Sequence, residues 1–175
     1  MLEMERTFLA KELPDLSSCK FKDMIDIYIP KAINHAPLRI RKNGDKYELT
    51  KKQPLNEGDS SRLVEQTINL SEEEFDALEK EVAGRRVYKR RYLFDFEGRI
   101  AEIDVFLKDL EGLVLVDFEF EKEEEKQAFV MPPFCLVDVT QEHFIAGGML
   151  CGKGYSDLEP DLARFNYKKI YTQLM

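Results

Sequence analysis

Short alternating segments dominate the pattern of hydrophobic and polar positions along the chain. Alternation with a period of two, in runs rich in β-branched and aromatic residues, predicts β-strands. Asn43-Gly44 and Glu97-Gly98 predict turns between neighbouring strands, and the first of these pairs tolerates positive φ. The predicted strands cover residues 2–9, 24–29, 36–42, 46–52, 62–70, 84–96, 99–107 and 113–121. About eight strands with mostly short connections favour a closed or nearly closed antiparallel β-barrel.

Helical patterns occur in three places. Residues 71–82 are the clearest case, because Ser71 and Glu74 form a capping box ahead of an apolar face. Residues 122–129 predict a short helix, and residues 161–175 predict a helix that closes the chain. The expected fold class is therefore α+β, with an eight-stranded antiparallel closed barrel and flanking helices.

Like charges two residues apart recur from strand to strand, with bulky apolar residues in the opposite phase. Alternation places each pair on one face of its strand. A solvated outer face explains a single pair, but such faces normally mix charges because like charges repel. The whole set therefore favours charged faces that point into a barrel. The pairs are Glu3/Glu5, Arg39/Arg41, Lys89/Arg91, Glu102/Asp104 and Asp117/Glu119.

A barrel interior that holds a basic and an acidic region suits the binding of phosphate groups together with a metal ion. Arginine binds phosphate oxygens in a bidentate manner, and clustered carboxylates suit a hard divalent cation such as Mg²⁺ or Mn²⁺. Phosphate and a divalent metal in one channel that excludes much of the water indicate phosphoryl or nucleotidyl transfer.

Overall composition narrows the choice of partners and compartment. The 175-residue chain carries 26 Lys and Arg against 34 Asp and Glu, a net charge of −8, which does not favour a nucleic-acid duplex or a membrane as partner. Three cysteines without a CxxC motif favour reduced thiols in a cytoplasmic protein. No signal peptide or membrane span is visible in the sequence. The length predicts a single domain over residues 1–175.

The ordered motifs resemble the CYTH domain superfamily, the triphosphate tunnel metalloenzymes. The family's E-x-E-x-K strand matches "EMERT", and its R-x-R strand matches "LRIRK". The family's Lys that follows a Leu-Thr pair matches "LTKK". The following basic and acidic strands match "YKRRY", "AEIDVF" and "VDFEF". The likeness runs to about residue 140, and residues 141–175 match less well.

The resemblance implies a hydrophilic tunnel in an eight-stranded barrel that hydrolyses inorganic triphosphate or a small organic triphosphate. Members typically use two divalent ions, here Mg²⁺ or Mn²⁺. The residues carried over as catalytic are Glu5, Arg39 and Lys89. Those implied to bind the triphosphate are Arg39, Arg41, Lys52, Arg62, Lys89 and Arg91. Those implied to hold metal ions or position the attacking water are Glu3, Glu5, Glu102, Asp104, Asp117 and Glu119.

Two positions depart from the family pattern. Thr7 stands where the opening motif has a Lys near the substrate phosphates, and Asp117 stands in place of a Glu. Lys11 or Lys20 is a candidate to supply the missing charge. The two histidines, His35 and His143, are interpreted as exposed loop residues.

Three other functions compete with hydrolysis. A class IV-type adenylate cyclase of the same fold would form cyclic AMP and pyrophosphate. A polyphosphate- or nucleotide-binding protein with low turnover would follow from the loss of the motif Lys at Thr7. An ordinary β-rich interaction domain would bind no triphosphate. The expected partner is a small-molecule triphosphate, and the expected assembly is a monomer or a homodimer.

Overall fold

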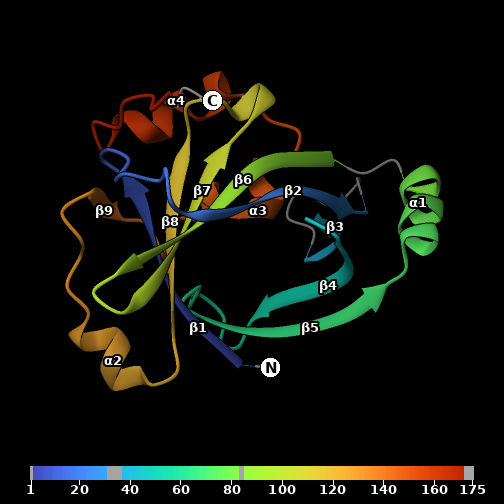
Figure 1. Cartoon of the computed structure of the whole chain (residues 1–175), viewed down its shortest axis with the longest axis horizontal. Coiled ribbons are helices and arrows are strands. Elements are labelled where there is room, and N and C mark those ends of the chain that lie inside the picture. The colour runs from blue at the N-terminus through green and yellow to red at the C-terminus, as the bar shows by residue number, and fades with distance from the viewer. Residues whose placement is uncertain (1, 31–36, 83–84, 172–175) are drawn as a thin grey trace.

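A computed structural model describes residues 2–30, 37–82 and 85–171 of the chain. Its strands form one continuous sheet (Figure 1). The strands are β1 (Leu2–Ala10), β2 (Lys20–Ile29), β3 (Leu38–Asn43), β4 (Lys46–Pro54), β5 (Arg62–Leu70), β6 (Arg85–Phe96), β7 (Arg99–Phe106), β8 (Val114–Phe120) and β9 (Cys135–Asp138).

The sheet closes on itself through β1. The strand order is β5-β4-β3-β2-β6-β7-β8-β1-β9, and β1 also pairs with β5, so the first eight strands form a barrel. One edge of β1 pairs with β8, and its other edge pairs with β5 at Leu2–Met4 and with β9 at Phe8–Ala10. All these pairings are antiparallel, which confirms the predicted eight-stranded antiparallel barrel.

Local sequence signals set several boundaries as expected. Gly44 and both residues of the Glu97-Gly98 pair have positive φ, as turns between antiparallel strands require. The capping box at Ser71 and Glu74 is present at the start of α1. The helices that flank the barrel are α1 (Glu72–Glu81), α2 (Glu123–Ala128), α3 (Gly147–Leu150) and α4 (Tyr155–Ala163), with short 3₁₀ turns η1 (Lys108–Leu110) and η2 (His143–Ile145).

The prediction of a closing helix over residues 161–175 is wrong. The helix in this region is α4, which lies earlier in the chain, and residues 164–171 have no regular helix. Tyr167 instead anchors this segment, because its hydroxyl accepts a hydrogen bond from the Val114 amide and donates one to the Gly112 carbonyl. Residues 172–175 of the predicted helix, and His35, lie outside the described residues.

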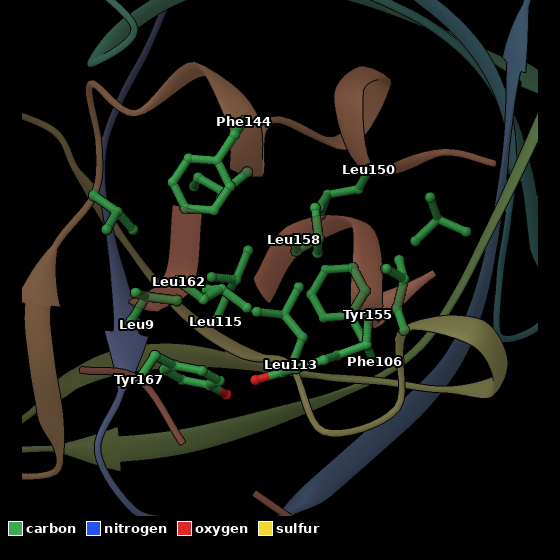
Figure 2. Close-up of a cluster of buried hydrophobic side chains, with 14 of the residues drawn as sticks. Leu9, Phe106, Leu113, Leu115, Phe144, Leu150, Tyr155, Leu158, Leu162 and Tyr167 are labelled. Carbon is green, nitrogen blue, oxygen red and sulfur yellow. The ribbon is translucent and has the colours of Figure 1, made fainter. Parts of the chain in front are cut away.

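The C-terminal segment fills one end of the barrel with apolar side chains. Leu150, Leu158 and Leu162 from the helices are almost completely buried against strand residues such as Leu9 and Leu115 (Figure 2). We call this cluster the apolar plug. At about 25 cal/mol per Å² of apolar surface removed from water, each such leucine stabilises the fold by roughly 2 kcal/mol.

Two smaller clusters cover the outside of the barrel. Phe8 and Phe118 point away from the interior and pack against Phe129, which follows α2. The same cluster contains Phe134, which precedes β9 and packs against Phe94 and Phe96. Phe75 of α1 packs on the outward faces of β2 and β3. These segments bury part of the outward phase of the strands, and the charged phase faces the interior. No helix within the described ranges is both long and apolar enough to cross a bilayer.

Candidate active site

The barrel encloses a cavity of about 400 Å³, within the range that small-molecule sites occupy. Its wall is formed by alternate residues of the strands, with the C-terminal segment contributing Thr140, Glu142 and His143. The charged strand residues that line it are Glu3, Glu5, Asp26, Arg39, Arg41, Glu48, Lys52, Glu65, Lys89, Arg91, Glu102, Asp104, Asp117 and Glu119.

Like charges gather on opposite halves of this wall. Strands β3 and β6 contribute Arg39, Arg41, Lys89 and Arg91, which we call the basic wall. Strands β1, β7 and β8 contribute Glu3, Glu5, Glu102, Asp117 and Glu119, which we call the acidic wall. The sheet order puts β2 between the two basic strands and keeps β7, β8 and β1 adjacent, so the separation follows from the topology.

Asp26 holds the basic wall together. Its carboxylate accepts hydrogen bonds from Nε of Arg41 at 2.5 Å and Nη2 of Arg41 at 2.8 Å, and lies 3.9 Å from Nη1 of Arg39. Burial by itself would raise the pKa of Asp26, but Arg41 and Arg39 outweigh burial and hold the pKa below its ordinary value. Asp26 is therefore ionised and neutralises part of the charge of two arginines that would otherwise repel each other.

Arg39 retains an unused donor inside the cavity. Its Nη1 donates to the Tyr28 hydroxyl at 3.3 Å, whereas its Nε is buried and has no hydrogen-bond partner among the described residues. A buried guanidinium donor without a partner costs free energy unless a ligand supplies an acceptor. The orphaned Nε thus marks a position suited to an anionic oxygen.

Asp104 joins the two walls. It is 1% exposed, accepts two hydrogen bonds from Arg91 at 2.7 Å each, and also pairs with Lys89. Burial favours a raised pKa, yet Arg91 and Lys89 together hold the pKa of Asp104 below its ordinary value. Both of its oxygens are engaged by cationic groups, so the geometry gives Asp104 the role of orienting Lys89 and Arg91 and does not favour the expected metal ligation.

Lys52 lies within the acidic wall. Its Nζ is 2.7 Å from Oε2 of Glu3 and 3.0 Å from Oε2 of Glu5. The two glutamates outweigh the opposing effect of burial and raise the pKa of Lys52. Lys52 therefore occupies, as a charged ammonium, the space between two residues that were expected to hold metal.

Asp117 and Glu119 are the least neutralised carboxylates of the acidic wall. Burial, reinforced by Asp104 and Glu5, raises the pKa of Asp117 to about 7. Burial, with Glu102 and Glu3, also raises the pKa of Glu119. The strand register sets Glu119 directly opposite Glu5, and opposed like charges destabilise a sheet unless a cation separates them.

The carboxylates of the cavity fit a divalent metal that needs few protein ligands. Among the described residues, no three Asp, Glu, His or Cys side chains converge on one point closely enough to form a cage. Lys52 and Arg91 lie between the carboxylates and keep them apart. Mg²⁺ needs no such cage, because it commonly binds one or two carboxylates and takes its other ligands from water and phosphate oxygens.

The excess of acidic over basic residues around the cavity also favours the binding of a divalent metal. Among the described residues that line the cavity, ten are carboxylic acids and five are Lys or Arg. A triphosphate carries several negative charges, so its entry into this cavity is opposed unless cations enter with it. Asp117 and Glu119 are the residues best placed to hold such a cation.

Arg62 is the predicted site residue that the structure does not bring to the cavity. On β5 the inward positions are Leu63 and Glu65, and the Arg62 guanidinium binds Glu123 of α2 at 2.7 Å. The expectation was wrong about this placement because the first residue of a strand does not reveal which phase faces inward. Lys11 and Lys20 are exposed and do not line the cavity, so neither supplies the charge missing at Thr7.

Several residues of the cavity wall were not predicted from the sequence. Asp26, Tyr28 and Glu65 each face the cavity, and none of them belongs to one of the predicted pairs of like charges. Asp26 had a usable signal, since a lone carboxylate in the apolar run "MIDIYI" requires a buried partner. His143 is exposed, as expected, and it also lies at the cavity wall.

Fold and site together define a closed antiparallel barrel with a cavity of segregated charge. The CYTH domain model matches residues 1–131, and the chain belongs to this family. An inorganic triphosphatase of Nitrosomonas europaea is 35% identical over 143 residues, which are 81% of this chain and 91% of that protein.

Solved structures show the same architecture. The crystal structure of an inorganic triphosphatase matches with a TM-score of 0.63 and 30% identity, covering 85% of this chain and 93% of that one. A protein of Pyrococcus horikoshii matches with a TM-score of 0.50 and 19% identity, covering 71% of this chain and 82% of that one, which supports the fold alone.

Proposed function

We propose that this protein is a metal-dependent hydrolase of inorganic triphosphate or a small organic triphosphate, with Mg²⁺ or Mn²⁺ as its cofactor. The observation that carries the proposal is the cavity itself, where a basic wall with an orphaned Arg39 donor lies across from the undercompensated carboxylates Asp117 and Glu119. The relative named as an inorganic triphosphatase supports the choice of substrate.

In this proposal the basic wall grips the polyphosphate. Arg39 and Arg41 are held by Tyr28 and Asp26, and Lys89 by Asp104, so these donors are oriented before the substrate arrives. Donors fixed in this way stabilise the charge that develops on the transferred phosphoryl group, without a cost of reorganisation during the reaction.

The acidic wall would hold the metal through Asp117 and Glu119, with Glu5 and Glu102 beside them. A divalent ion held there would polarise phosphate oxygens and make a nearby water more acidic. Glu5 remains the proposed residue for positioning that water. In the overall reaction the water oxygen bonds to a terminal phosphorus, a P–O–P bond breaks, and phosphate and diphosphate are released.

The test is phosphate release from inorganic triphosphate, with and without Mg²⁺, Mn²⁺ and EDTA. We expect release that requires the metal and stops when EDTA removes it. Folded protein that releases no phosphate with either metal contradicts the proposal. Stabilisation by triphosphate without release would favour the low-turnover binding protein, and cyclic AMP with pyrophosphate from ATP would favour the cyclase.

Two arginine variants provide a matched comparison. Arg39→Ala removes a donor inside the cavity, and loss of one fixed donor to a developing charge costs about 10²–10³ in kcat. Arg62→Ala removes an arginine bound to Glu123 outside the cavity, and we expect activity within about 3-fold of the unaltered protein. Equal losses in the two variants would show that the cavity is not the site.

The partner, the cellular location and the assembly of the protein are proposed on the same basis. A small-molecule triphosphate as partner fits a cavity of this volume and supports neither a nucleic-acid duplex nor a membrane. Cys19, Cys135 and Cys151 are free thiols, which supports a cytoplasmic location. A monomer or a homodimer remains the proposed assembly for the single domain over residues 1–175.

A further inference from the structure

Thr7 makes a specific contact at the position where the family motif has a lysine. Its side chain faces the cavity, is 9% exposed, and donates a hydrogen bond from Oγ1 to Oδ1 of Asp117 at 2.7 Å. The two residues are direct partners in the β1–β8 register. The backbone of Thr7 is fixed as well, because its amide donates to Oγ1 of Thr140 at 3.0 Å and its carbonyl accepts from the Val139 amide at 2.8 Å.

Asp117 is half-buried and differs from Asp26 and Asp104, the two buried aspartates of the cavity. Asp26 and Asp104 each receive two hydrogen bonds from one arginine. Oδ2 of Asp117 accepts no hydrogen bond within the described part of the chain, and the nearest cationic atom, Nη2 of Arg91, is 3.5 Å away. Thr7 thus fixes one oxygen of this carboxylate with a neutral donor and leaves the other oxygen available.

We propose that Thr7 is a positioning residue for a divalent cation, holding Asp117 so that its Oδ2 is presented to the metal. The inference rests on the proposed function, since it concerns the metal of that same site. Carboxylates that bind metals are themselves oriented by hydrogen bonds, and removal of such a partner typically lowers metal affinity or activity 10–100-fold. A lysine at position 7 would instead place an ammonium against Asp117 and compete with the metal.

The experiment measures Mn²⁺ binding to the substrate-free protein, using the electron paramagnetic resonance signal of the unbound ion. Thr7→Val removes the hydroxyl with little change of shape, and we expect Mn²⁺ affinity to fall about 10-fold. Thr7→Ser retains the donor and is expected to bind within about 3-fold of the unaltered protein. Thr7→Lys is expected to weaken binding more than Thr7→Val does.

Thr50→Val is the matched control. Thr50 is a 2% exposed threonine at an inward position of β4, and its hydroxyl pairs with Thr67 at 3.1 Å rather than with a carboxylate. We expect this variant to bind Mn²⁺ as the unaltered protein does. In turnover, Thr7→Val is expected to raise the Mn²⁺ concentration needed for half-maximal rate, with kcat at saturating Mn²⁺ changed less than about 3-fold.

The outcomes separate this inference from the proposed function. Unchanged Mn²⁺ affinity in Thr7→Val, an equal loss in Thr50→Val, or no Mn²⁺ binding by the unaltered protein each overturns the role of Thr7. Phosphate release is measured independently of Mn²⁺ binding. The expected order of affinities without any phosphate release would retain the role of Thr7 and refute the hydrolase.

Discussion

Asp26→Asn should destabilise the protein far more than Asp23→Asn, although both residues lie on β2 and accept two hydrogen bonds from an arginine of a neighbouring strand. Asp26 binds Arg41 inside the barrel, and Asp23 binds Arg90 on the outside. The two carboxylate side chains differ in exposure, at 3% for Asp26 and 59% for Asp23. The pair of variants therefore isolates the effect of burial on one kind of interaction.

The expected magnitudes follow from that difference. Removing one partner of a buried ion pair costs about 3–5 kcal/mol, because the remaining charge is left uncompensated. Glu48 lies opposite Arg41 in the β3–β4 register and offsets part of this cost, so we expect about 3 kcal/mol for Asp26→Asn. The exposed pair should contribute less than about 1 kcal/mol to Asp23→Asn.

Urea denaturation followed by circular dichroism measures both values. With a urea m-value of about 2 kcal/mol per M, the midpoint should fall by about 1.5 M for Asp26→Asn and by less than about 0.5 M for Asp23→Asn. Inorganic triphosphate should stabilise Asp26→Asn more than it stabilises the unaltered protein, because the anion restores negative charge beside Arg41.

The difference in stability between the unaltered protein and Asp26→Asn depends on pH. The pKa of Asp26 is lower in the folded protein than the ordinary value near 3.9, so its ionisation stabilises the fold above that pH and less as the pH falls below it. At pH 3 the gap between the unaltered protein and Asp26→Asn should be narrower by about 1 kcal/mol than at pH 7. Equal midpoints for the two variants, or a gap that widens in acid, would refute the reasoning.

Two further changes test the C-terminal segment. Leu158→Ala opens a void in the apolar plug, where Leu158 is 0% exposed, and should lower the free energy of unfolding by about 2–5 kcal/mol in urea denaturation. Exposed Leu55→Ala is the control and should change it by less than about 0.5 kcal/mol. Tyr167→Phe removes the acceptor of the Val114 amide, while the Gly112 carbonyl keeps its hydrogen bond from the Ile170 amide, and should cost about 1–3 kcal/mol. Tyr171→Phe on the exposed tail should cost almost nothing. Stability retained in Tyr167→Phe would show that this hydroxyl does not anchor the segment.

Much of the fold could be predicted because its signals are local. Alternation with a period of two, the Asn43-Gly44 turn and the Ser71 capping box each depend on residues that are neighbours in the chain. β9 gave no such signal, because it is a four-residue strand that forms by pairing with β1. α4 did carry a local signal that was missed, since Tyr155, Leu158 and Leu162 are spaced to share one helix face. That this face packs in the apolar plug is not visible in the sequence of the segment itself.

The features of the site likewise divide into those that follow from the local sequence and those that depend on the tertiary structure. The sequence by itself determined that Glu3 with Glu5 and Arg39 with Arg41 share a strand face, because side chains alternate along any strand. Only the tertiary structure decided that Arg62 binds Glu123 outside the cavity and that Arg91 and Lys89 engage Asp104. It also decided that Oδ2 of Asp117 lies 3.5 Å from Nη2 of Arg91 and accepts no hydrogen bond from the described residues. Those outcomes depend on register and barrel closure between segments far apart in the chain. The physical reason is that a residue's face is a local property, whereas the partner that neutralises its charge is chosen by packing.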